Sequence, residues 1–238
     1  MSCYDSQVIQ RLTAIRLDDC ARIPLTIDDA TPALKGLATG IQTVTRTRQM
    51  DVPTTTIVKT IDGGSCTKPR PNPTDRGFSF ALAFCGQNPL FEVLAGYKTL
   101  DLDGVDIIGW EDVAITALPK LALEIIFTPS ADACASGDAP QCIAVLIPAL
   151  EQWVRSGDEV FNGDDTPDLT MTGQTAKNAN LFQNYTSGTL PGYLTHWSTK
   201  FDDIATGRSW VYTKLIDCPT ADDSEDPCTL VALTAPVS

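Results

Sequence analysis

Alternation of apolar and polar residues is the dominant pattern along the chain, and it predicts β-strands. The stretch 77–85, GFSFALAFC, is the clearest case. Its large apolar residues share one face of a strand: Phe78, Phe80, Leu82 and Phe84. The stretch 121–127, LALEIIF, places a second such set on one face: Leu121, Leu123, Ile125 and Phe127. QCIAVLI at 141–147 is a short apolar run typical of a buried strand. The pattern therefore predicts a chain built mainly of β-structure.

Further strands are predicted by runs rich in Thr, Val, Tyr and Trp. These runs are TVTRTR and TTTIVKT within 43–60, DLTMTGQTA at 168–176 and RSWVYTKLI at 208–216. The stretch 61–76, IDGGSCTKPRPNPTDR, holds three prolines and two glycines, so we expect a loop there. Periodicity does not decide between strand and helix for 6–18.

One short helix interrupts this β pattern at about 88–96, NPLFEVLAG. Asn88 suits the N-cap, Pro89 the first helical position and Gly96 the C-terminal end. At least six strands with one flanking helix predict a mainly β fold, a β-sandwich or barrel-like domain. We see no internal repeat and no interdomain linker, so we expect a single domain over 1–238. The acidic, proline-bearing stretch 219–238 is expected to be an exposed tail.

Net charge is unevenly distributed over the 238 residues and sums to −13. Residues 1–98 carry 11 basic and 9 acidic residues, whereas residues 99–238 carry 6 and 21. Such an acidic surface repels phosphates, so ordinary binding of DNA or RNA is not expected, although DNA could pass nearby without adhering. No apolar run approaches the ~20 residues that a membrane helix requires. The amino terminus has no recognisable secretory signal, which favours a soluble protein made in the cytoplasm.

Eight cysteines occur, and none belongs to a C-x-x-C pair. Two pairs bracket short, turn-rich loops: Cys134 with Cys142, and Cys218 with Cys228. Each pair is a candidate for a loop-closing disulfide if the protein meets an oxidising environment, and free thiols are the alternative. Connectivity cannot be deduced from spacing.

Motifs that carry catalysis are missing from the sequence. The single histidine, His196, lies in YLTHWSTK, where we expect a loop or strand edge and a structural role. DLDGVD at 101–106 and NGDDTPD at 162–168 cluster carboxylates, yet neither has the spacing of a calcium loop, so solvated turns are favoured over metal sites. No phosphate-binding loop or nucleophile elbow occurs, and no cofactor is expected.

The most basic part of the chain is a cluster in its first third: Arg46, Arg48, Lys68, Arg70 and Arg76. An exposed loop and strand edge would account for it. Alternatively, these groups meet the acidic half of a neighbouring copy, because opposite charges on one chain favour head-to-tail association.

The order of four segments resembles the major tail tube proteins of long-tailed (siphovirus-type) bacteriophages. These segments are FSFALAFC (78–85), NPLFEVLAG (88–96), LDLDGVDIIGW (100–110) and LALEIIF (121–127). The resemblance continues through CIAVLIPAL (142–150) and NGDDTPDLTMTGQTAKN (162–178), so that it covers roughly residues 40–218.

This resemblance implies a structural virion protein without enzymatic activity or cofactor. Six copies would form a ring, and stacked rings would form the tail tube that conducts genomic double-stranded DNA from capsid to host. The implied partners are further copies of the chain, a tape-measure protein and other tail proteins, with no membrane anchor. Asp101, Asp103 and Asp106 would then face the neighbouring ring or the channel. The implied location is the virion tail, after assembly in the host cytoplasm.

Two other functions remain open at the level of sequence. A monomeric β-sandwich that binds a carbohydrate or protein, such as an adhesin module, could use tryptophans to stack on sugar rings. The four tryptophans are Trp110, Trp153, Trp197 and Trp210. A hydrolase that uses paired carboxylates is the third alternative.

Overall fold

A computed structural model describes fifteen stretches of the chain, and all structural statements below concern these residues. They are 7–18, 20, 22–24, 34–37, 41–52, 57–59, 65–67, 73–85, 98–102, 106–111, 120–129, 141–156, 168–190, 192–218 and 231–232.

Strands make up most of the described structure, which confirms the predicted mainly β fold class. In chain order they are β1 (Gln7–Leu17), β2 (Leu34–Leu37), β3 (Ile41–Asp51), β4 (Ile57–Lys59), β5 (Ser65–Thr67), β6 (Thr74–Cys85), β7 (Lys98–Leu102), β8 (Asp106–Glu111), β9 (Lys120–Pro129), β10 (Gln141–Ser156), β11 (Asp168–Thr175), β12 (Tyr212–Asp217) and β13 (Val231–Ala232). A 3₁₀ helix, η1 (Gly192–Lys200), leads into the short helix α2 (Phe201–Ala205).

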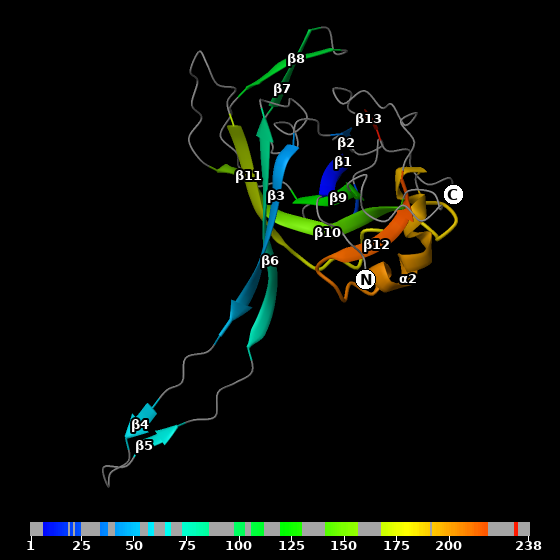
Figure 1. Ribbon diagram of the computed structural model, residues 1–238. Helices are drawn as coiled ribbons and strands as arrows, with labels where there is room; N and C mark the ends of the chain where they lie inside the picture. Colours follow the sequence, from blue (N-terminus) through cyan, green and yellow to red (C-terminus); the bar gives the residue numbers. More distant parts are fainter. Residues whose placement is uncertain are drawn as a thin grey trace.

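Nine of these strands form one curled antiparallel sheet (Figure 1). Its order is β13-β2-β1-β9-β10-β11-β6-β3, with β12 also paired to β10. Both β4–β5 and β7–β8 are separate two-stranded hairpins. In Figure 1 they lie at opposite ends of the molecule, β4–β5 beyond the lower ends of β3 and β6 and β7–β8 at the top.

β10 is the strand around which the sheet curls. Its first part pairs with β12, its last part with β11, and β9 lies along its other side. The register with β9 shifts between Ile147 and Leu150, and Pro148 lies within this irregularity. Proline has no N–H to donate to a ladder, so a bulge is where a central strand tolerates it. The long strand can therefore bend without leaving a broken ladder bond.

Two apolar clusters fill the interior, and β9 contributes to both. Leu121, Leu123 and Ile125 are buried in one cluster together with Trp153, as the alternation of 121–127 predicts. The opposite face of β9 is buried too, because Ala122 and Ile126 lie in the second cluster. Helical residues cover that face: Leu194, Trp197 and Ile204.

Several sequence-based expectations need correction. The stretch 61–76 is not wholly a loop, because β5 pairs with β4 and β6 already begins at Thr74. The prolines and glycines of that stretch concealed the short strand β5 and the first residues of β6. The predicted strand 208–216 is regular only from Tyr212 onward. The ambiguous stretch 6–18 contains the strand β1.

The structure also contains helical residues where the sequence predicted none. The predicted helix at 88–96 lies outside the described residues, and the helical segment at 192–205 was not anticipated. His196 consequently lies in a 3₁₀ helix rather than in a loop or strand edge. The expected exposed tail 219–238 is interrupted as well, because Val231 and Ala232 pair with β2.

The disulfide pairing predicted from loop spacing is wrong. Cys142 is bonded to Cys218, with Cα atoms 4.8 Å apart, although 76 residues separate them in sequence. β12 pairs with the first part of β10, and this places Ile216 opposite Cys142 and Cys218 two residues further on. Sheet pairing rather than loop length therefore selects the partner. Cys134 and Cys228 lie outside the described residues.

Candidate functional site

Strand β3 lies at one edge of the sheet and pairs with β6. Their ladder runs from Ile41 opposite Phe84 to Asp51 opposite Thr74. Beyond this ladder, β4 pairs with β5, and these two strands lie on an arm that projects from the body (Figure 1). We call residues 51–74 the arm. Within the described part of the chain, the outer edge of β3 pairs with no strand.

Polar and exposed side chains line β3. Thr43, Thr45 and Thr47 are exposed, while Val44 packs against the core. Further along the strand Arg46 and Arg48 are also exposed, so both faces of β3 meet solvent near the arm. At 11 residues, β3 is long for an edge strand. The free N–H and C=O groups along such an edge can pair with another chain.

Ion pairs fix the base of the arm. The Arg48 guanidinium donates to the Asp75 carboxylate at 2.9 Å, and Arg76 donates to Asp51 at 2.7 Å. Both pairs cross between β3 and β6. Exposed pairs contribute little to stability, so their main effect is on side-chain position. Asp75 is nevertheless perturbed: the hydrogen bonds from Arg48 and from the Gly77 N–H lower the pKa of its carboxyl group.

Gly77 lies where the arm meets the body. A register shift falls between Gln49 and Met50 of β3, and Gly77 has a φ of +93°. A Cβ at this position would lie 2.8 Å from Thr175 Oγ1 and 3.0 Å from the Trp210 ring. Glycine is therefore required for two reasons, a left-handed backbone and the close approach of the tryptophan.

Trp210 reaches Gly77 because the chain turns after α2. Gly207 has a φ of +59°, and a Cβ there would lie 2.9 Å from the Ala179 backbone nitrogen. This turn ends the helix in the manner of a glycine C-cap. It directs 208–211 toward the β3–β6 ladder, which explains why this stretch is not the regular strand that its composition predicts.

Between the base of the arm and 208–213 lies an open groove of about 460 Å³. Its lining residues are Arg46, Arg48, Asp75, Phe78, Lys177, Arg208, Ser209, Trp210, Val211 and Thr213. Arg46 lies over the Phe78 ring at 5.0 Å from the centroid, and Lys177 lies over the Trp210 ring at the same distance. Cation–π contacts of this kind hold charged side chains without neutralising them. We call this site the basic groove.

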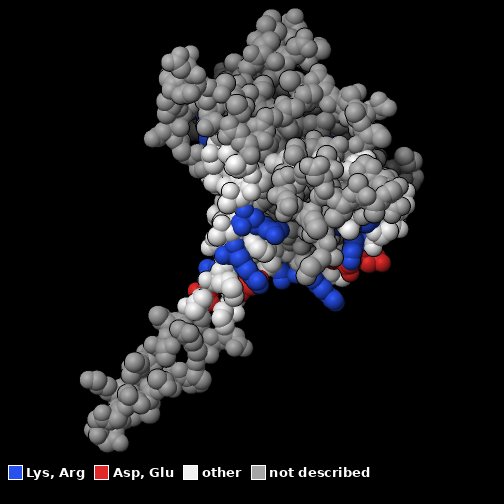
Figure 2. Space-filling model, viewed as in Figure 1, with Lys and Arg blue, Asp and Glu red and all other residues white. Residues whose placement is uncertain are grey.

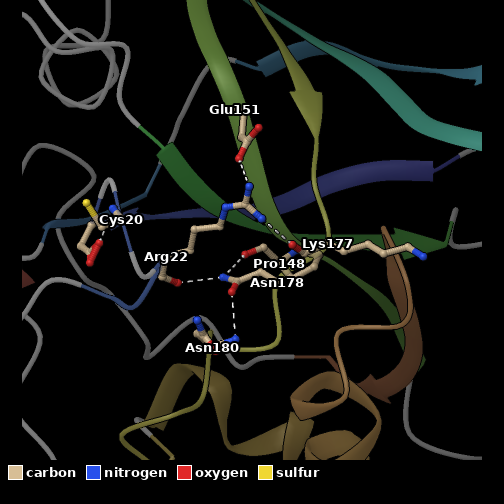
Figure 3. Close-up of polar contacts among 8 residues, drawn as sticks. Cys20, Arg22, Pro148, Glu151, Lys177, Asn178 and Asn180 are labelled. Carbon is tan, nitrogen blue, oxygen red and sulfur yellow. Dashed lines mark hydrogen bonds and ion pairs between the residues drawn. The ribbon is translucent and has the colours of Figure 1, made fainter.

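Lys177 is positioned by a group of hydrogen bonds around the buried side chain of Asn178, which we call the clasp (Figure 3). Asn178 is buried, and its side-chain amide donates to the carbonyl oxygens of Arg22 at 2.8 Å and Pro148 at 3.0 Å. Arg22 in turn donates to the Lys177 carbonyl at 2.8 Å and pairs with Glu151 at 2.5 Å. The backbone at Lys177 is thus held from two directions, while its side chain extends away from the clasp in Figure 3.

The basic groove has an excess of unpaired positive charge. Among the described residues, Arg48 is the one groove cation that forms an ion pair with a carboxylate, Asp75, and Lys177 interacts with Asp75 at longer range. In the part of the chain that the structure describes, no carboxylate lies within ion-pair distance of Arg46, Lys177 or Arg208. Figure 2 shows Lys and Arg side chains gathered where the arm joins the body. This concentration is unusual on a chain with a net charge of −13.

Sequence reasoning found only part of this site. Of the predicted basic cluster, Arg46 and Arg48 line the groove, and Arg76 pairs with Asp51 beside it. Lys68 and Arg70 lie outside the described residues. Lys177 and Arg208 were missed, since they are more than 100 residues from β3 and carry no local motif. Trp210 was considered only as one of four tryptophans that could stack on a sugar ring.

The predicted acidic loop belongs to the β7–β8 hairpin. Asp101 is in β7, Asp106 is in β8, and Leu102 is paired with Asp106. Asp103 lies outside the described residues, in the connection 103–105. Asp101 and Asp106 are thus at one end of a two-stranded hairpin.

The structure also locates residues that were considered for sugar stacking, metal binding or membrane insertion. Two tryptophans considered for sugar stacking, Trp153 and Trp197, are fully buried. Among the described residues, no group of three or more His, Cys, Asp or Glu side chains is placed to hold a metal ion. Their helices include none that is both long and apolar enough to cross a membrane.

Comparison with protein-family models gave no match to this chain, and comparison with curated proteins gave none either. The case for a function therefore depends on the residues and the geometry described above.

Proposed function

We propose that this protein is a self-assembling structural subunit of a tail tube, of the type found in long-tailed bacteriophages. Copies associate side by side into rings, six per ring by the resemblance of the sequence, and the rings stack into a tube that conducts double-stranded DNA. The acidic surface of the assembled wall repels the DNA phosphates, so the genome passes without adhering. No catalysis is part of this role.

The observation that carries the proposal is the 11-residue edge strand β3, which continues directly into the arm. A free edge of this length tends to recruit another strand, and natural monomers usually cover or interrupt it. Addition of a strand from the next copy would close the curled sheets into a continuous ring. The arm, which extends beyond the body, then has a neighbouring copy to contact (Figure 1).

Negative-stain electron microscopy of the purified, concentrated protein at two salt concentrations tests this function. We expect rings or hollow tubes of uniform width. A protein that stays monomeric at every concentration, with retention of a sugar or protein ligand, would overturn the proposal in favour of the binding module.

A matched variant identifies the element responsible. Asp51 and Thr74 are paired across the ladder, so residues 52–73 can be replaced by Asn-Gly, which closes a two-residue hairpin. We expect this armless variant to keep the circular dichroism spectrum and unfolding midpoint of the body but to lose assembly. Tubes formed by the armless variant would show that the arm is dispensable.

A further inference from the structure

The basic groove and the β7–β8 hairpin have complementary charge and lie toward opposite ends of strand β6 (Figure 1). The groove lies at the base of the arm, and the hairpin lies beyond the opposite end of β6 (Figure 1). From Phe78 in the groove to Cys85 at the end of β6 are seven residues, or roughly 23 Å of strand. A hairpin at the top of the molecule therefore cannot fill the groove of its own chain.

The charge of the groove favours an anionic occupant. Arg46, Lys177 and Arg208 have no carboxylate partner within the described residues, and two of them are held in place by the Phe78 and Trp210 rings. Exposed cations preorganised in this way favour carboxylates, which they can meet without further ordering of their side chains. The overall charge of −13 disfavours a nucleic acid as that occupant.

We propose that the basic groove binds the acidic end of the β7–β8 hairpin, at Asp101 and Asp106, of a second copy of this chain. This inference rests on the proposed self-assembly and adds the direction of stacking. Because the two surfaces differ and lie toward opposite ends of β6, the contact is heterologous, and its repetition produces an open, directional stack rather than a closed dimer. Lateral contacts through β3 make the ring, and the contact between groove and hairpin joins one ring to the next.

Two charge-reversal variants test the contact. The groove variant carries Lys177→Glu and Arg208→Glu, and the hairpin variant carries Asp101→Lys, Asp103→Lys and Asp106→Lys. Lys177 and Arg208 are exposed, so their replacement does not disturb the core. Each variant alone places like charges at the junction and is expected to form single rings without stacks. An equimolar mixture pairs each reversed surface with its complement and is expected to form stacks again.

A peptide measurement separates this inference from the proposed function, since it does not require tubes. The probe is a fluorescein-labelled, cyclised peptide of residues 98–111, and fluorescence anisotropy is measured with the full-length protein. We expect binding that weakens as salt is raised, and at least about tenfold weaker binding to the groove variant. The matched control peptide carries Asn in place of Asp101, Asp103 and Asp106.

Several outcomes would overturn the inference. These are equal binding of the Asp and Asn peptides, full binding to the groove variant, or stacks formed by either variant alone. Tighter binding of a peptide of residues 219–230, or of a 20-nucleotide DNA, at the same groove would assign it a different occupant. Peptide binding without any tubes would uphold the groove contact while the proposed function fails.

Discussion

Glu124 Oε1 lies 2.6 Å from Nε2 of His196, which is the single histidine of the chain. The glutamate side chain is fully buried on β9, and it also accepts a hydrogen bond from Trp197 Nε1 at 2.6 Å. Arg11 NH2 lies 3.5 Å from the other carboxylate oxygen. One buried acid thus joins strand β9 to two side chains of the 3₁₀ helix η1.

Removal of this carboxylate should destabilise the fold strongly. We expect Glu124→Ala to lower the free energy of unfolding by about 3–5 kcal/mol, because it leaves buried donors without their acceptor. Glu124→Gln keeps the shape and one acceptor oxygen, so its loss should be smaller. Urea unfolding followed by tryptophan fluorescence measures both. Asp202→Asn, at an exposed acid of α2, is the matched control and should be neutral.

The Cys142–Cys218 disulfide should be a main source of stability under oxidising conditions. Its loop of 76 residues restricts the unfolded chain, so the double change Cys142→Ser with Cys218→Ser should lower the free energy of unfolding by roughly 2–5 kcal/mol. Thermal unfolding with and without dithiothreitol checks this. Cys20→Ser replaces an exposed free thiol and should leave the midpoint unchanged. A wild-type midpoint that does not respond to the reductant would contradict the prediction.

Gly77→Ala should disturb the junction between arm and body. An alanine at a φ of +93° is strained by about 1–2 kcal/mol, and its Cβ would press on Thr175 Oγ1 and the Trp210 ring. Thr175 Oγ1 also accepts the Phe78 N–H at 2.8 Å, so its displacement would weaken that hydrogen bond. Gly188→Ala is the control, because a Cβ there meets nothing within 4 Å. Chemical denaturation should show a loss for the first variant and none for the second.

Asp75 should make the base of the arm sensitive to acid. Its pKa is lowered from 3.8 by Arg48 and by the Gly77 N–H, so the folded protein binds this proton less tightly than the unfolded chain does. The resulting stabilisation is present above pH 3.8 and is lost as the pH falls through the lower folded pKa. In Arg48→Gln the pKa of Asp75 should move back toward 3.8, which an NMR titration of the carboxyl carbon can follow. An unchanged pKa would show that Arg48 is not its main determinant.

In two predicted strands, the local alternation of apolar and polar residues correctly indicates buried side chains. Phe80 and Leu82 of β6, and Leu121, Leu123 and Ile125 of β9, are buried as their alternation indicates. Alternation could not reveal that the other face of β9 is also buried, because Glu124 interrupts an apolar run there. Only the packing of η1 and α2 against that face explains how the acid is accommodated.

The basic groove gave a weaker signal in the sequence. Arg46 and Arg48 were recognised as a basic cluster because they are neighbours on one strand. Lys177 and Arg208 are single charges in polar surroundings, and nothing local distinguishes them from ordinary surface residues. They join the groove because Asn178 fixes the backbone on one side and Gly207 turns it on the other.

The sequence by itself determined the β fold class, the main core strands and the uneven charge of this protein, because side-chain alternation and composition are local properties. Only the tertiary structure decided which cysteines are bonded, where the helical segment packs and which cations share a groove. Those features depend on contacts between residues far apart in the chain, as the pairing of β10 with β12 demonstrates for Cys142 and Cys218. Spacing along the chain does not encode such contacts, because they arise only when the whole sheet is assembled.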